Sequence, residues 1–154
     1  KPTASTMLLP VLQSLFQRDL NRLKQEIALY TNEQHIWRID KDIKNSAGNL
    51  TLHLIGNLNT YIGAVLGKTG YVRHRELEFS LKDIPSSELL AKIDATILMI
   101  QNVLDAIPED SLQVEYPVLV FEQKTSTQYL LVHLATHLTY HLGQVNYHRR
   151  LLDV

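Results

Sequence analysis

Three histidines recur at every fourth position near the end of the chain, and a fourth follows seven residues later. They are His133, His137, His141 and His148, more than half of the seven histidines in the sequence. Side chains four residues apart lie one turn apart on the same face of an α-helix. Neutral imidazole is the commonest protein ligand for transition metals, so this segment predicts a metal site.

Helical geometry assigns these histidines to different sides of their helix. At about 100° per residue, His137 lies near 40° and His141 near 80° from His133. The apolar residues of the same helix span an arc from about 60° to about 180°. His141 therefore lies inside the apolar arc, His137 on its edge and His133 outside it. We expect His137 and His141 to be ligands and His133 to be a poorer one.

A partner histidine lies on an earlier predicted helix. Taking His53 as the origin there, Asn57 lies near 40° and Tyr61 near 80°, on the apolar side of the helix. His53 thus borders the apolar face, and two helices can bring imidazoles together at one end of a helix bundle. A lone histidine at such a position is more often a hydrogen-bonded core residue, so its position alone leaves both interpretations open.

The remaining histidines carry weaker signals. His35 and His74 fall in predicted loops, where we expect solvated surface residues. His148 either packs near the end of the chain or supports the metal ligands from behind. A single histidine pair at helical spacing favours metal binding and an ordinary structural role about equally. The partner histidine on another helix is what favours the metal site.

Four long segments carry apolar residues at the spacing of amphipathic helices. The predicted helices run over about residues 6–30, from a cap at Asn45 or Ser46 to the break at Gly67 and Gly70, from Pro85 and Ser86 to Pro108, and from a capping box at Thr125 to about Leu152. This pattern predicts an all-α fold, a four-helix bundle. A length of 154 residues suits one domain, which we expect to span residues 1–154.

The predicted connections are longer than typical bundle loops, which suits a functional role. Between the third and fourth helices, residues 114–121 are rich in β-branched and aromatic side chains. They predict a short extended segment or hairpin that Pro117 would hold to an edge. Residues 32–44 form a predicted loop with a buried anchor at Ile36 and Trp37.

Composition excludes several classes of protein. A formal net charge of −1 without a Lys/Arg cluster gives no electrostatic footprint for nucleic acid. No run approaches the ~18 apolar residues of a membrane span. The chain has no cysteine, which removes disulfides, thiolate ligands and a protein thiol nucleophile. Residues 1–6 lack a charged-then-apolar signal pattern, so we expect a cytoplasmic protein.

Two windows of the chain resemble motifs of the DinB/YfiT-like superfamily of metal-dependent four-helix-bundle proteins. Residues 137–144 (HLTYHLGQ) look like its last-helix motif. Residues 45–57 (NSAGNLTLHLIGN) are similar to its second-helix motif, which ends in a lone ligand histidine. The loop at Trp37 and Arg38 is also similar, and the order of four helices agrees across nearly the full length.

The resemblance implies a metal site made by His53, His137 and His141 at one end of the bundle. It also implies that the protein pairs into homodimers. The chain departs from the family motif at Leu138, where many members have glutamate. A side chain at that position would point away from the histidine face, so the departure is compatible with metal binding but leaves no acid or base there.

Three neutral imidazoles leave a divalent ion with its full charge and at least one open coordination position, which is typical of a catalytic site. Such an ion lowers the pKa of bound water to about 7 or deprotonates a coordinating thiol. We expect zinc or nickel first, with manganese or iron as alternatives. Candidates for orienting the ligands or a substrate are Asn57, Tyr61, Gln144 and His148. The sequence assigns no catalytic residue.

Relatives in that superfamily include thiol-dependent S-transferases and a thiol-dependent isomerase. The resemblance therefore implies an enzyme in which a low-molecular-weight thiol, supplied from outside this cysteine-free chain, attacks a small electrophile. Two alternatives stay open: a metal-dependent hydrolase, and a non-catalytic, stress-associated dimer in which the ion only ties two helices together. A fourth tight ligand, from His133 or His148, would favour the structural role, whereas an open position in a cavity would favour catalysis.

Overall fold

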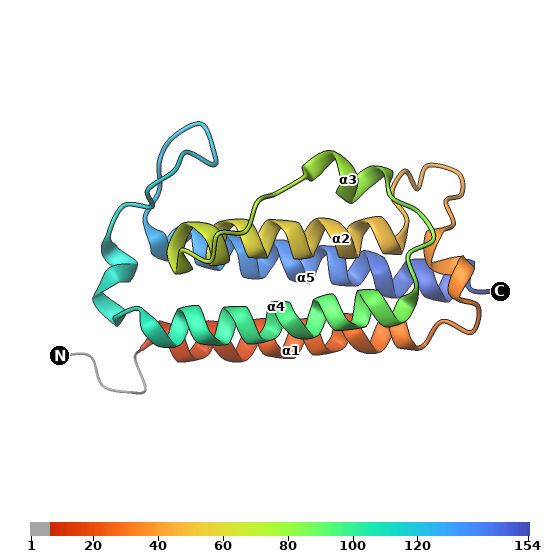
Figure 1. Ribbon diagram of the computed structural model, residues 1–154, viewed down its shortest axis with the longest axis horizontal. Coiled ribbons are helices and arrows are strands. Elements are labelled where there is room, and N and C mark those ends of the chain that lie inside the picture. Colours follow the sequence, from red (N-terminus) through yellow and green to blue (C-terminus); the bar gives the residue numbers. More distant parts are fainter. Residues whose placement is uncertain (1–6) are drawn as a thin grey trace.

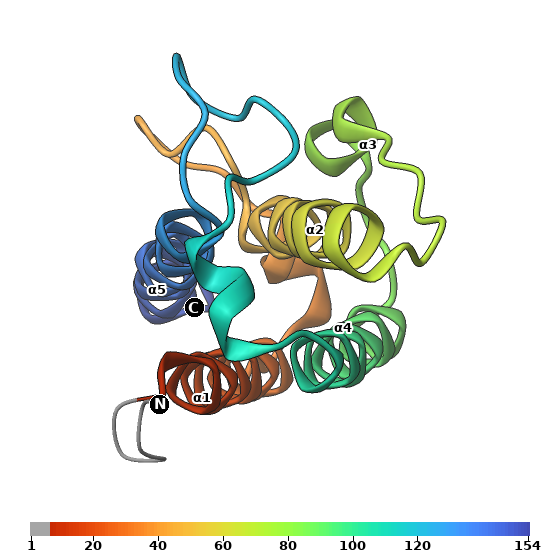
Figure 2. The ribbon, with the colours of Figure 1, turned by 90° about the vertical axis from the view of Figure 1, so that its left-hand side faces the viewer.

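The computed structural model describes residues 7–154, and in that range the chain is all-helical (Figure 1), as the sequence predicts. Four long helices lie side by side and are seen nearly end-on in Figure 2. They are α1 (Leu8–Ala28), α2 (Ala47–Leu58), α4 (Ser86–Ala106) and α5 (Thr127–Leu152). The connections hold a short helix, α3 (Arg75–Ser80), and two 3₁₀ turns, η2 (Glu33–Trp37) and η4 (Glu109–Gln113). The predicted start of the first helix at Thr6 lies outside the described residues.

The helix starts follow local capping chemistry. Ser46 caps α2, as predicted, by accepting a hydrogen bond from the backbone N–H of Asn49 at 3.1 Å. α4 begins directly after Pro85, also as predicted. At α5 the cap is Ser126, whose hydroxyl accepts a hydrogen bond from a backbone N–H three residues later. The predicted cap at Thr125 is therefore wrong by one residue, because two neighbouring hydroxyl residues satisfy the same pattern.

The four long helices enclose one apolar core. α1 packs against α4 and α5, and α2 packs against the same two helices from the other side (Figure 2). Residues at three-and-four spacing fill the centre, and burying one such leucine contributes about 1.5–3 kcal/mol. The most deeply buried of them include Leu12, Phe16, Leu20, Leu54, Leu58, Ile93, Leu130 and Leu134. This core fixes the α2 and α5 faces that carry the histidines.

The end of the second long helix is wound more widely than an α-helix. α2 continues directly into a π-helical segment, η3 (Asn59–Leu66), where Thr60 donates its hydroxyl hydrogen to the carbonyl of Gly56 at 2.7 Å. The helix ends at Gly67, where an added Cβ would come within 2.4 Å of Val103. A π-helical stretch changes the angle between successive side chains, so the α-helical angle predicted for Tyr61 does not apply.

The predicted extended segment before α5 is reduced to one contact. Residues 114–121 form no strand, and a single antiparallel bridge joins Glu115 to Ser126. The backbone N–H of Tyr116 donates to the carbonyl of Thr125 at 2.8 Å. No further bridge follows it in the described residues. The hairpin prediction is therefore wrong beyond this bridge.

Two other connections pack on the helices. Ile36 and Trp37, the predicted anchor of the 32–44 loop, are both buried. The short helix α3, which periodicity did not predict, packs against α2. Among residues 7–154, no helix is long and apolar enough to cross a membrane.

Candidate metal centre

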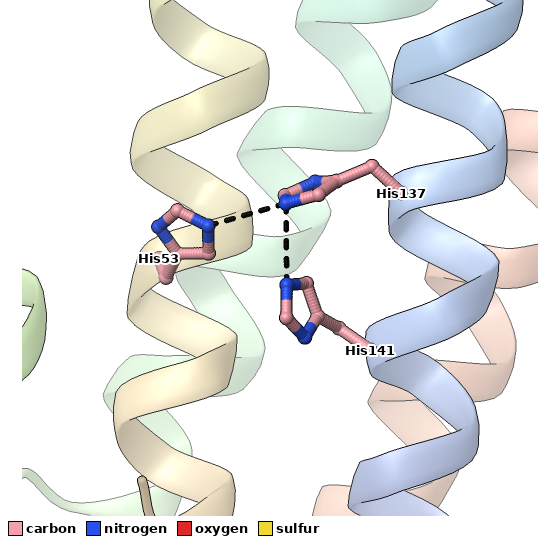
Figure 3. Close-up of side chains that lie close together, drawn as sticks. All are labelled: His53, His137 and His141. Carbon is pink, nitrogen blue, oxygen red and sulfur yellow. Dashed lines mark hydrogen bonds between the residues drawn. The ribbon is translucent and has the colours of Figure 1, made fainter.

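Three imidazoles meet between α2 and α5 (Figure 3). His53 comes from α2, and His137 and His141 come from successive turns of α5. Nε2 of His137 lies 3.3 Å from Nε2 of His53 and 3.2 Å from Nε2 of His141. All three ligand atoms lie within 4.8 Å of one another, close enough to hold one metal ion. The cluster lies near the middle of α5, whereas the sequence resemblance implied a site at one end of the bundle.

The spacing of these nitrogens fits a small ion. Two nitrogens that each lie about 2.05 Å from one tetrahedral zinc ion are about 3.3 Å apart. Two of the three Nε2–Nε2 distances, 3.3 and 3.2 Å, agree with that value, and the third pair lies within 4.8 Å. The donor set is also suitable, because imidazole nitrogen binds zinc, copper, iron and nickel.

Oxygen atoms behind two of the rings determine where the ring protons lie. Nδ1 of His53 is 3.1 Å from Oε1 of Glu78, and Nδ1 of His141 is 2.7 Å from Oε1 of Gln144. Since these oxygens accept, each Nδ1 donates and each Nε2 keeps a free lone pair. Arg73 also approaches Nδ1 of His53, at 3.4 Å, but this contact is longer, and the same nitrogen of Arg73 donates to Glu78 at 2.9 Å.

The resulting arrangement has at most one proton between three nitrogen atoms at its centre. Two lone pairs, on His53 and His141, face Nε2 of His137, which has at most one proton to share. At least one of the two short nitrogen contacts is therefore repulsive between neutral rings. A cation held by three lone pairs removes this repulsion, which is the physical argument for a metal site here.

Burial favours the neutral form of His53 and His137. Burial, together with the neighbouring His141 and His53, lowers the pKa of His137 to about 4. Burial also lowers the pKa of His53, although the contact with Glu78 opposes this shift. The lone pair of His137 is thus available for a metal at neutral pH.

A segment before α4 supports His53 from outside the helix pair. Nε and Nη2 of Arg73 donate to the two oxygens of Glu78 at 2.8 and 2.9 Å, and the carboxylate is buried. Gly56 makes room for it, because an added Cβ would lie 1.9 Å from Oε2 of Glu78. The ring of Phe79 packs against His53 with centroids 5.1 Å apart. Sequence analysis missed Arg73 and Glu78, and the one available signal was a glycine inside an apolar helix.

A pocket of about 350 Å³ opens beside His53 and His137. Its lining also includes Asn57, Tyr61, Arg73, Arg75 and Val120. Oδ1 of Asn57 and Nδ1 of His137 are buried there without a hydrogen-bond partner in the described part of the chain. His137 therefore lacks the oxygen acceptor that the other two rings have. Of the predicted supporting residues, Asn57 and Tyr61 lie at this pocket, and Gln144 contacts His141.

A second pocket, of about 490 Å³, lies on the other side of the cluster. His141 and Gln144 line it together with Lys44 from the 32–44 loop and Tyr147 from α5. His148 also lines this pocket, but its ring nitrogens contact the hydroxyl of Tyr30 and the carbonyl of Arg38, not the three-histidine cluster. The three-histidine cluster thus has space on two sides.

The other histidines lie outside the group. His133 stacks on His137 with ring centroids 6.0 Å apart and is not among the three clustered ligands, in line with its expected position. His74 is exposed, as predicted. The prediction for His35 is wrong: its Nδ1 lies 2.8 Å from Oδ1 of Asp153, and the side chain is 12% exposed. The carboxylate comes from the end of the chain, which local sequence cannot reveal.

The fold and the site define an all-helical protein with three converging imidazoles between two helices and pockets on both sides. The model of a family described as "Protein of unknown function (DUF1572)" matches residues 3–153. Because the match covers nearly the whole chain, the protein belongs to this family. No curated protein matches the chain.

Proposed function

We propose that the protein is a divalent-metal-dependent enzyme of the DinB/YfiT-like type. In this proposal His53, His137 and His141 hold one ion, and a low-molecular-weight thiol activated there attacks a small electrophile. The convergence of three Nε2 atoms carries the proposal, because two of those atoms have free lone pairs. The four long helices packed side by side support the four-helix bundle of that superfamily.

The surroundings of the cluster favour catalysis over a purely structural ion. Three protein ligands leave a fourth position on a tetrahedral ion. Within residues 7–154, the group that could hold the ion contains no fourth histidine, cysteine or carboxylate. Pockets adjoin both His137 and His141, so small molecules have space next to the cluster.

The residues of the chain would orient and shield the reacting groups. A divalent ion supplies Lewis-acid chemistry that stabilises a thiolate or hydroxide at neutral pH. Glu78 and Gln144 hold two ligand rings with Nε2 toward the centre. Phe79 packs against the ring of His53. Zinc or nickel suits the three nitrogens best in this proposal, with manganese or iron as alternatives.

Two measurements test the proposal. Protein prepared without a histidine tag should contain one divalent ion per chain by elemental analysis. The metal-loaded protein should conjugate monochlorobimane with a cellular thiol such as cysteine faster than the thiol reacts alone. Chelation and the His137→Ala substitution should abolish this increase.

The alternatives give different results. If a broad panel of thiols and electrophiles shows no metal-dependent conjugation, the transferase proposal is wrong. Metal-dependent cleavage of a nitrophenyl ester would then support a hydrolase. Bound metal without either reaction would support a metal-binding protein in which the ion ties α2 to α5.

We further propose a cytoplasmic homodimer, as the superfamily resemblance implies. Large apolar side chains exposed along α5, at Tyr140, Tyr147 and Leu151, support a contact between two copies. Light scattering should give twice the chain mass, and Tyr147→Glu should give the single-chain mass. A monomer in the unsubstituted protein would contradict this proposal.

A further inference from the structure

The pocket beside His53 and His137 carries an excess of positive charge. Two arginines, Arg73 and Arg75, line it, and no carboxylate does. Glu78 offsets the charge of Arg73 from behind, through two hydrogen bonds. In the described residues, no salt bridge joins Arg75 to a carboxylate. One unneutralised guanidinium therefore remains at the pocket.

Aromatic packing keeps this guanidinium next to the site. Arg75 is the first residue of α3, and its guanidinium carbon lies 5.7 Å from the centre of the Phe79 ring. Phe79 in turn packs against His53. This contact leaves the N–H groups of Arg75 free, and a guanidinium fork matches the geometry of a carboxylate.

The second pocket differs in charge although it adjoins the same cluster. Its charged lining residues are Asp42 and Lys44, one of each sign, and the tyrosines Tyr140 and Tyr147 accompany them. These opposite charges give an anion no net electrostatic attraction to the second pocket. The pocket with Arg75 attracts anions even before a metal ion of charge +2 is added. The two sides of the cluster thus favour different chemical groups.

We propose that the pocket with Arg75 binds the carboxylate of an anionic substrate, so that the thiol used by this protein carries a carboxylate as well as a sulfur. This inference rests on the proposed thiol chemistry and names its substrate class. Arg75 acts as the specificity residue that receives the carboxylate. Arg73 is the weaker candidate, because Glu78 already neutralises its charge through two hydrogen bonds.

Cobalt-loaded protein provides a direct test, because a thiolate that binds cobalt changes its absorption spectrum. The probes are 3-mercaptopropionate and 6-mercaptohexanoate, each compared with the alcohol of the same chain length. At one or both lengths the acid should bind at least about tenfold more tightly than the alcohol, as expected for a charge-assisted hydrogen bond. Arg75→Ala should remove this preference without changing the affinity for the alcohols or the cobalt content.

Lys44→Ala is the matched control, because Lys44 is a cation at the other pocket and should leave the preference unchanged. Equal binding of acids and alcohols by the unsubstituted protein would overturn the inference. A preference that survives Arg75→Ala would also overturn it, because Arg75 would then not be the group that receives the carboxylate.

A third result separates this inference from the proposed function. If no thiol changes the cobalt spectrum, the thiol proposal fails. Calorimetry with glutarate and metal-free protein then tests the anion pocket alone. Heat of binding that disappears in Arg75→Ala would support a carboxylate pocket, and heat that is absent or unchanged would overturn it.

Discussion

Two histidine environments lie on the same helix, α5, and they have opposite hydrogen-bonding patterns. At the candidate metal centre, Nδ1 of His141 donates to Gln144, and Nε2 faces another imidazole. Near the chain end, Nε2 of His148 is 2.8 Å from the carbonyl of Arg38, and Nδ1 is 2.6 Å from the hydroxyl of Tyr30. Because a carbonyl only accepts, His148 has its proton on Nε2, and its Nδ1 accepts from Tyr30.

The difference separates a candidate ligand from a structural histidine. Burial lowers the pKa of both His137 and His148. His148, however, has a protein partner for each nitrogen, whereas the three clustered rings direct Nε2 at one another. A lowered pKa and a position on α5 are thus common to the candidate ligands and to the structural histidine. The lone pairs on Nε2 that have no hydrogen-bond donor distinguish the candidate metal centre.

The largest expected effect is the loss of metal on removal of a ligand. His141→Ala should eliminate stoichiometric binding of zinc, measured by elemental analysis after gel filtration. His133→Ala and His148→Ala should each retain one ion per chain, because neither ring belongs to the cluster. Retained metal in His141→Ala together with lost metal in His133→Ala would place the site one turn earlier along α5.

For the metal-free protein, we expect His148→Ala to lower the free energy of unfolding more than His137→Ala does. His148→Ala leaves the hydroxyl of Tyr30 and the carbonyl of Arg38 without their partner and should cost about 2–4 kcal/mol of unfolding free energy. His137→Ala should cost less, because it also relieves contacts between neighbouring imidazoles. Urea unfolding in the presence of a chelator measures both values. A larger cost for His137→Ala would contradict the distinction between the two environments.

A smaller effect is expected when the support of a ligand is disturbed. Gly56→Ala should displace the carboxylate of Glu78 from His53 and weaken zinc affinity by about 10–100-fold, as should Glu78→Gln. Competition with a chromogenic chelator measures the affinity. The control is Gly143→Ala, since an added Cβ at Gly143 of α5 has no neighbour within 4 Å. Equal affinities in all these variants would mean that Glu78 does not support the site.

The smallest effect concerns acid stability at the end of the chain that holds His148. Burial opposes ionisation of Asp153, but hydrogen bonds from the Thr31 backbone, His35 and the Asn32 backbone outweigh it and lower its pKa to about 2. A carboxyl group with a lowered folded-state pKa contributes stability above about pH 4 and loses it as the pH falls toward 2. Asp153→Asn should therefore flatten the decline of melting temperature over that range. An unchanged decline would contradict this role.

Local patterns predict the long helices and the pair of clustered histidines on α5. Apolar periodicity and the Ser46 cap depend on residues close together in sequence, so they place α2 and its His53 well. The pairing of His137 with His141 follows from helix geometry alone. The sequence resemblance, and not the spacing, selected His53 as their partner.

Residues whose positions depend on distant contacts escape such prediction. Arg73 and Glu78 belong to a polar segment without periodicity and reach His53 only because α3 packs on α2. His35 was expected at the surface, but the chain end brings Asp153 to it. The π-helical turn that carries Tyr61 has no signature in hydrophobic spacing.

The central claim is that three imidazoles bind one ion, and X-ray absorption at the zinc edge tests it most directly. Untagged protein loaded with one zinc ion per chain should show three imidazole nitrogens at about 2.0–2.1 Å and one further light atom. The spectrum should lose one imidazole in His141→Ala and stay unchanged in His133→Ala. A shell of four imidazoles, or zinc without imidazole ligands, would contradict the account.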